Sequence, residues 1–93
     1  MRVGNLYEVE VTLQNSQGMH VRPAKLFVEL AIKFSSHVDV VFKDLSANGK
    51  SIMGLLGLLA YKGCTLKIRA TGDDAQEAVT ALAKLVNSGF NEE

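Results

Sequence analysis

Hydrophobic and polar residues alternate along three stretches of the chain, with the period of two that is typical of half-buried β-strands. The apolar positions are Tyr7, Val9, Val11 and Leu13, then Val38, Val40 and Phe42, and then Leu66, Ile68 and Ala70. A turn at Lys43 and Asp44 predicts a further short strand over residues 45–47. The pattern therefore predicts four strands.

Two stretches between the strands have apolar residues spaced as on one face of an α-helix. The first helix is predicted over residues 21–34, with Pro23 in its first turn, where no backbone N–H is needed. A short apolar helix is predicted over residues 51–58. We assign three leucines of this second segment to the core, namely Leu55, Leu58 and Leu59.

The last helix has the most complete set of boundary signals. Its apolar stripe covers residues 75–86, and Asp74 is the predicted N-cap, with Glu77 as its capping-box partner. Gly89 stands where a glycine commonly ends a helix, and Phe90 follows as the usual hydrophobic contact. These signals predict a helix that begins after Asp74 and ends before Gly89.

The elements follow one another in the order β-α-β-β-α-β-α. Strands that alternate in polarity imply a sheet with one wet face, so the helices must cover the other face. The expected fold is an open-faced α/β sandwich, a four-stranded antiparallel sheet with three helices on one face. We expect a single domain over residues 1–93.

Composition narrows the class of protein. Ten basic and ten acidic residues give no net charge, which argues against general nucleic-acid binding. Cys64 is the one cysteine, so no internal disulfide can form, and no zinc-ligand spacing is present. The longest apolar run, residues 52–61, is too short to cross a bilayer, and the N-terminus lacks the apolar region of a signal peptide. We expect a cytoplasmic protein without membrane insertion.

His20 lies between the first strand and the first helix. The free N–H groups at a helix start stabilise an anion, and Arg22 adds a planar cation that suits phosphate oxygens. Gly18 allows a tight turn and Pro23 fixes the first helical turn. A neutral imidazole there can attack phosphorus and form a reactive phosphoramidate, with no metal or other cofactor on the carrier. The residues alone leave open a simpler interpretation, in which His20 only caps the helix.

Two segments carry a resemblance to a known family. Gly18-Met19-His20-Val21-Arg22-Pro23-Ala24 resembles the active-site signature of HPr, the histidine-containing phosphocarrier family of the bacterial phosphoenolpyruvate-dependent phosphotransferase system. Asn48-Gly49-Lys50-Ser51-Ile52-Met53-Gly54 is similar to the regulatory serine segment of that family. Chain length and element order match as well, so the resemblance covers nearly the whole chain.

The resemblance implies a function in sugar uptake. His20 would accept a phosphoryl group from enzyme I and pass it to an enzyme IIA component, without independent turnover, and Arg22 would steady that group. Val21 stands where alanine or threonine is commoner, and Glu29 where some members carry a basic residue. The second departure concerns the identity of the partner, not the chemistry. We expect a monomer that presents one site to two partners in turn.

Ser51 has two compatible interpretations. It is a good N-cap for the short helix, and by resemblance it is the serine modified by the HPr kinase/phosphorylase. A phosphate there would add negative charge inside the docking surface and weaken binding to an acidic partner face. Partly exposed apolar residues beside it are the predicted docking patch, namely Ile52, Met53 and Leu56.

Gly49-Lys50-Ser51 also has the ending of a phosphate-binding P-loop. The full motif needs a glycine five residues before Gly49, and Asp44 stands there. An acidic side chain would repel the phosphates, so nucleotide binding is not expected. His37 is expected to begin an exposed strand without a functional role.

Two alternatives stay open. A carrier of the same family could serve a regulatory, nitrogen-related branch with the same site residues. A non-catalytic interaction domain on a similar sandwich would keep its binding and its biological output when His20 is replaced by alanine.

Overall fold

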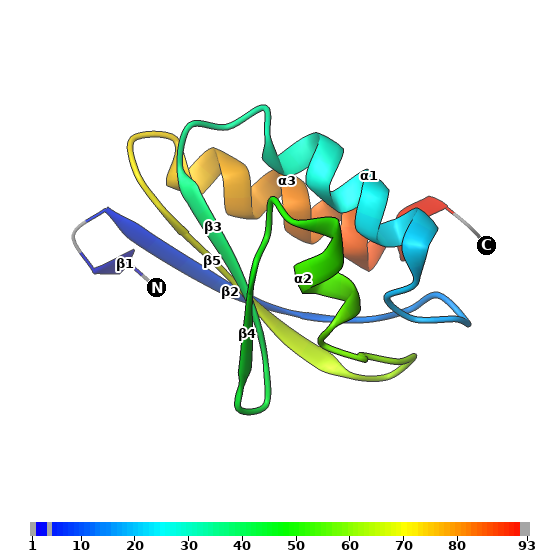
Figure 1. Ribbon diagram of the computed structural model, residues 1–93. Helices are drawn as coiled ribbons and strands as arrows, with labels where there is room; N and C mark the ends of the chain where they lie inside the picture. Colours follow the sequence, from blue (N-terminus) through cyan, green and yellow to red (C-terminus); the bar gives the residue numbers. More distant parts are fainter. Residues whose placement is uncertain (1, 4, 92–93) are drawn as a thin grey trace.

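The computed structural model describes residues 2–3 and 5–91. The elements in chain order are β1 (Arg2–Val3), β2 (Leu6–Thr12), α1 (Val21–Ala31), β3 (His37–Phe42), β4 (Leu45–Asn48), α2 (Ile52–Leu56), β5 (Thr65–Thr71), α3 (Ala75–Asn87) and the 3-10 turn η1 (Gly89–Asn91). The three helices lie on one face of the sheet, with α1 and α3 side by side (Figure 1).

The sheet is antiparallel throughout, in the order β1-β2-β5-β3-β4. Its four longer strands confirm the predicted open-faced sandwich. The two-residue strand β1 was not predicted, because a segment this short carries no alternating pattern; it pairs Arg2 with Tyr7 and Val3 with Leu6 at the edge. In the centre, Ile68 of β5 pairs with Val9 on one side and Val40 on the other.

The helical face of the sheet holds the core. Val40 and Ile68 are fully buried there, beneath Phe27 of α1 and Leu82 of α3. The open face is polar: the Arg69 Nε donates to a Glu8 oxygen 2.5 Å away, and Lys67 lies 3.9 Å from the other oxygen. The hydrogen bond from Arg69 is the main reason that the pKa of Glu8 is lowered.

Helix α1 ends earlier than predicted. Its last regular turn closes with the Ile32 N–H on the Val28 carbonyl, after which Lys33 and Phe34 bond to the carbonyls three residues before them. The chain therefore leaves the helix in a tight turn, and the predicted end at Phe34 is wrong by about one turn. The Phe34 carbonyl instead accepts a hydrogen bond from Lys50 Nζ at 2.8 Å. Helix α2 is shorter than predicted at both ends.

Helix α3 begins after Asp74 as predicted, but the capping box is wrong. The Asp74 side chain makes no hydrogen bond to the helix start. Its carboxylate accepts from the backbone N–H groups of Ser35 and Ser36 and from the Ser36 hydroxyl, because the α1–β3 loop lies against it. At the other end Gly89 adopts a φ of +70°, and Phe90 is fully buried, which confirms both end signals.

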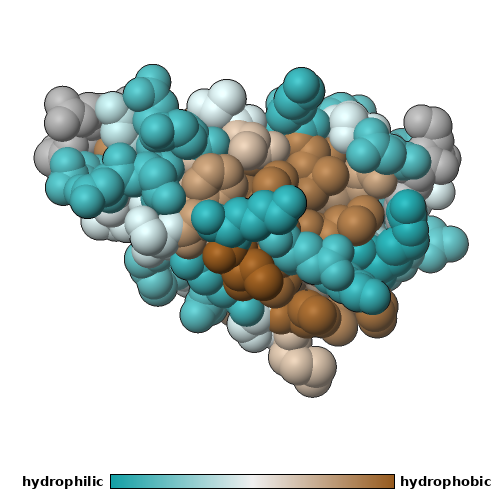
Figure 2. Space-filling view, turned by 90° about the horizontal axis from the view of Figure 1, so that it is seen from above, coloured by the Kyte–Doolittle hydropathy of each residue, from teal (hydrophilic) through white to brown (hydrophobic). Residues whose placement is uncertain are grey.

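Within residues 2–3 and 5–91, no helix has the length and hydrophobicity needed to cross a membrane. Seen from the helical side, hydrophobic side chains gather over the middle of this face and are crossed by a hydrophilic band (Figure 2). This face also carries α1, the helix that begins after His20.

Candidate functional site

His20 occupies the N-cap position of α1. Its backbone is extended (φ −101°, ψ −170°), and its carbonyl accepts the Ala24 N–H at 3.0 Å. The imidazole makes no capping hydrogen bond, so the fold does not use the ring to close the helix. The half-buried ring therefore stands at the positive end of the helix dipole, where an anion attached to it is favoured.

The loop before His20 is held from within by Asn15. This fully buried side chain donates through Nδ2 to the Gly18 carbonyl at 2.6 Å, and the Gly18 N–H donates back to the Asn15 carbonyl at 3.1 Å. The His20 N–H bonds to the same Gly18 carbonyl at 3.0 Å. Asn15 was not singled out from the sequence alone; an asparagine three residues before a glycine was the available signal for this closed turn.

Gly18 is required by both its conformation and its surroundings. Its φ is +64°, and a Cβ there would lie 2.6 Å from the Ala60 carbonyl oxygen and 2.6 Å from the Tyr61 Cα. Directly after it, the Met19 N–H donates to the same Ala60 carbonyl at 3.0 Å. The loop that carries His20 is thus fixed against residues 60–61, and glycine alone fits the contact.

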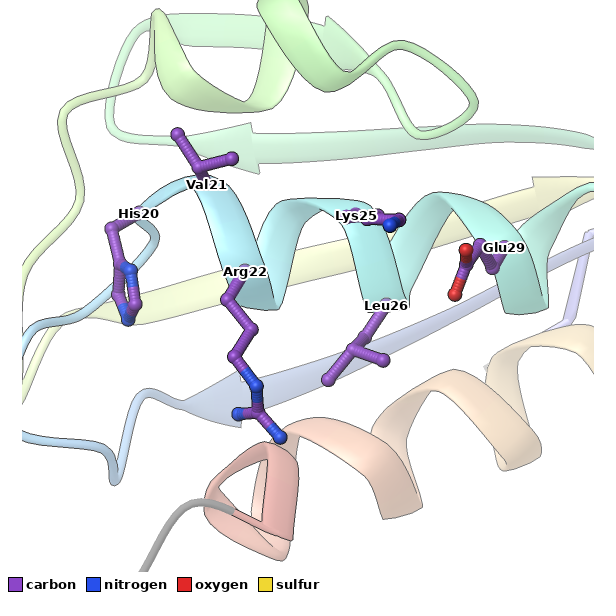
Figure 3. Close-up of a pocket in the computed structure, with 6 residues that line it drawn as sticks. All are labelled: His20, Val21, Arg22, Lys25, Leu26 and Glu29. Carbon is purple, nitrogen blue, oxygen red and sulfur yellow. The ribbon is translucent and has the colours of Figure 1, made fainter.

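A groove of about 580 Å³ runs along α1 from the candidate site. Its lining residues are His20, Val21, Arg22, Lys25, Leu26 and Glu29. The side chains of His20, Arg22 and Leu26 point to the same side of the helix (Figure 3). Arg22 is exposed, and Pro23 is buried in the first turn of α1. The groove is cationic near His20 and acidic at Glu29, two turns further along.

Ser51 is the N-cap of α2, which confirms its structural prediction. Its Oγ accepts the Gly54 N–H at 3.0 Å, and the residue is half-buried. Among the predicted docking residues, Met53 is strongly exposed, whereas Ile52 and Leu56 are half-buried against the core. Only Met53 therefore presents most of its side chain to solvent.

The leucines after α2 divide differently from the prediction. Leu55 and Leu58 are buried as expected, but Leu59 is 78% exposed. Its φ of 56° turns the chain sharply, and the side chain of this residue points away from the core as a result. The assignment of Leu59 to the core is therefore wrong. Tyr61, in the loop between α2 and β5, is exposed as well.

The P-loop likeness of residues 49–51 finds no support in the geometry. The Lys50 ammonium, which would bind phosphate in a P-loop, donates to the Phe34 carbonyl at 2.8 Å. The Gly49 N–H donates to the Val38 carbonyl at 2.7 Å. Asp44 lies in the exposed turn between β3 and β4. The Lys50 and Gly49 hydrogen bonds therefore hold this segment within the fold. Within the described part of the chain, no cluster of three or more His, Cys, Asp or Glu residues could hold a metal ion.

The chain is similar in sequence to known proteins over most of its length. A family model described as "PTS HPr component phosphorylation site" matches residues 7–88. Phosphocarrier protein HPr of Neisseria meningitidis serogroup A is 40% identical over 82 residues, which cover 88% of this chain and 92% of the relative.

The fold is also similar to solved structures of HPr proteins. HPr-C-His from Thermoanaerobacter tengcongensis has a TM-score of 0.90 and 45% identity, covering 94% of this chain and 98% of that one. An HPr dimer from the same organism has a TM-score of 0.75 and 44% identity, covering 92% of this chain and 99% of that one.

Proposed function

This chain belongs to the HPr family of phosphocarrier proteins of the phosphotransferase system, and we propose that it carries the phosphoryl group on His20, from phosphorylated enzyme I to enzyme IIA components in sugar uptake. The observation that carries the assignment is the position of His20 at the N-cap of α1, where it lines one groove together with Arg22. His37, the second histidine, lies on the exposed face of β3 and bonds to Asp39 at 3.0 Å.

The proposed reaction is an in-line transfer between two proteins. An unprotonated imidazole nitrogen of His20 attacks the phosphorus of the phosphorylated donor; the new N–P bond forms as the bond to the donor breaks. The helix start and Arg22 stabilise the charge on the phosphoryl oxygens, while Gly18 and Pro23 keep the ring at that position. The same steps in reverse order hand the group to the acceptor, so the carrier needs no metal or other cofactor of its own.

Regulation at Ser51 is part of the proposal. An HPr kinase/phosphorylase would transfer a phosphate to the Ser51 Oγ, which stands at the N-cap of α2 next to the exposed Met53. The phosphate oxygens can still accept the Gly54 N–H, so α2 tolerates the modification. Its negative charge would oppose an acidic partner surface that docks on Arg22 and Lys25.

The oligomeric state remains a prediction. We propose a monomer, because the groove beside His20 must meet a donor and then an acceptor. Because a related HPr from Thermoanaerobacter tengcongensis was solved as a dimer, the mass of this protein in solution should be measured directly.

Intact mass spectrometry tests the proposed carrier residue. The chain is incubated with enzyme I from the same organism, phosphoenolpyruvate and Mg²⁺, alongside His20→Ala and the matched control His37→Ala. We expect the wild type and His37→Ala to gain one acid-labile phosphoryl group, and His20→Ala to gain none. A gain by His20→Ala would exclude His20 as the carrier. No gain by the wild type would remove the carrier function and favour a non-catalytic interaction domain.

A further inference from the structure

Leu59 combines two unfavourable features in one residue. Its φ of 56° lies in the left-handed region, which costs a residue with a bulky side chain conformational energy. Its apolar side chain is also 78% exposed, so the chain gains no core packing in return. Leu59 lies in the turn that follows α2, with its N–H on the Leu56 carbonyl at 3.2 Å, and turns favour glycine at such a left-handed position.

Gly57, two residues before Leu59, shows the opposite combination of residue and backbone conformation. Its φ is −65°, a conformation that any residue adopts, and an added Cβ would meet nothing closer than the Gly54 carbonyl oxygen at 3.4 Å. The sequence thus has glycine where the backbone does not need it and leucine where the backbone favours glycine. Folding alone does not account for leucine at position 59.

Leu59 directly precedes the two residues that contact the loop carrying His20. The carbonyl of the next residue, Ala60, accepts the Met19 N–H at 3.0 Å, and residues 60–61 form the wall against Gly18. The loop after α2 and the loop before α1 lie next to each other at one end of the molecule (Figure 1). Exposed apolar side chains come from the start of α1, from α2 and from the loop after α2, namely Val21, Met53, Leu59 and Tyr61.

We propose that Leu59 is a docking residue that sets the affinity for the protein that phosphorylates His20. This inference rests on the proposed function. The donor protein would receive the Leu59 side chain in an apolar recess, and acidic groups beside the recess would face Arg22 and Lys25 of the groove. Burial of Leu59 in the complex offsets the strain and exposure that it carries in the free protein. Leu59 touches the partner and takes no part in the chemical step.

Substitutions at Leu59 separate docking from folding. Leu59→Gly removes the side chain and relieves the backbone; Leu59→Asn also suits the left-handed region but is polar. Lys43→Gly is the matched control, because Lys43 has nearly the same φ of 55° in the exposed β3–β4 turn. Each protein is phosphorylated by enzyme I with phosphoenolpyruvate and Mg²⁺, and its KM, kcat and melting temperature are measured.

We expect both Leu59 variants to raise the KM about tenfold, the range of a buried docking residue, with the kcat within about twofold of wild type. Their melting temperatures should equal or exceed that of wild type. Lys43→Gly should match the Leu59 variants in stability and the wild type in KM.

An unchanged KM in both Leu59 variants would overturn the inference and leave the carrier function intact. A melting temperature lowered in both variants, together with a raised KM, would overturn it as well, because Leu59 would then belong to the fold. If the wild type itself is not phosphorylated, the proposed function fails and the inference fails with it.

Discussion

The Asp74 carboxylate stands at the start of α3 but binds Ser36, which lies at the end of the α1–β3 loop. One of its oxygens accepts the Ser36 N–H at 2.9 Å together with the Ser36 hydroxyl, and the other accepts the Ser35 N–H at 2.9 Å. The contact joins residues 38 positions apart in the chain. It fixes the loop that leads from α1 into β3 against the first turn of α3.

This contact predicts an acid-sensitive contribution to stability. The Ser36 hydroxyl, followed by the Ser35 N–H, lowers the pKa of Asp74 from its ordinary value of 3.8. A lowered pKa in the folded state means that the contribution is fully present above pH 3.8 and is lost as the pH falls from there through the folded-state pKa. Thermal unfolding from pH 7 to pH 2 measures it.

Asp74→Asn should melt several degrees below wild type at pH 7, and the difference should shrink in acid. Asp73→Asn is the matched control, since it removes an exposed carboxylate from the neighbouring residue without touching the serines. A constant difference across the pH range would contradict an ionised Asp74 as the source of the effect.

Asp74 also illustrates which features of the fold could not be predicted from the sequence. Alternation identified three of the four longer strands, and the turn at Lys43 and Asp44 indicated the fourth. The position of His20 before a helix followed from Gly18 and Pro23. All of these signals are local. Asp74 and Glu77 have capping-box spacing, but the Asp74 carboxylate binds Ser35 and Ser36 instead. Because these serines are distant in the sequence, no local pattern indicates the contact. Leu59 was misassigned for a related reason: periodicity extends a pattern through the residue at which the chain turns.

Gly18→Ala should destabilise the protein and misplace His20. The new Cβ would lie 2.6 Å from the Ala60 carbonyl oxygen, in a residue with φ of +64°. Left-handed strain and overpacking together predict a loss of about 2–4 kcal/mol in the free energy of unfolding, measured by chemical denaturation. Gly63→Ala is the control, because its φ is +90° but no atom lies within 4 Å of the added Cβ. Equal losses in the two variants would show that the contact with residue 60 contributes nothing.

Arg22→Lys should slow phosphoryl transfer without affecting the fold. The exposed Arg22 side chain lines the groove next to His20, and lysine keeps its charge but not the planar pair of donors that matches two phosphoryl oxygens. We expect the kcat/KM for phosphorylation by enzyme I to fall about tenfold, equivalent to about 1.4 kcal/mol of transition-state stabilisation. Lys25→Arg, one turn away in the same groove, should stay within about twofold. Similar losses in both would indicate that overall charge matters and the guanidinium geometry does not.

Substitutions at Ser51 distinguish its structural role from its proposed regulatory role. Ser51→Ala removes the acceptor of the Gly54 N–H and should lower stability by about 1 kcal/mol, with little effect on transfer to His20.

Ser51→Asp keeps a good N-cap and adds the negative charge that a phosphate would bring. It should therefore retain near wild-type stability while the KM for phosphorylation by enzyme I rises several-fold, more steeply at low salt because the repulsion is electrostatic. Ser46→Asp is the control: it adds the same charge to exposed β4, outside α2 and the His20 loop, and should leave the KM unchanged. A rise in KM for Ser46→Asp equal to that for Ser51→Asp would indicate a general effect of net charge and argue against a local regulatory site at Ser51.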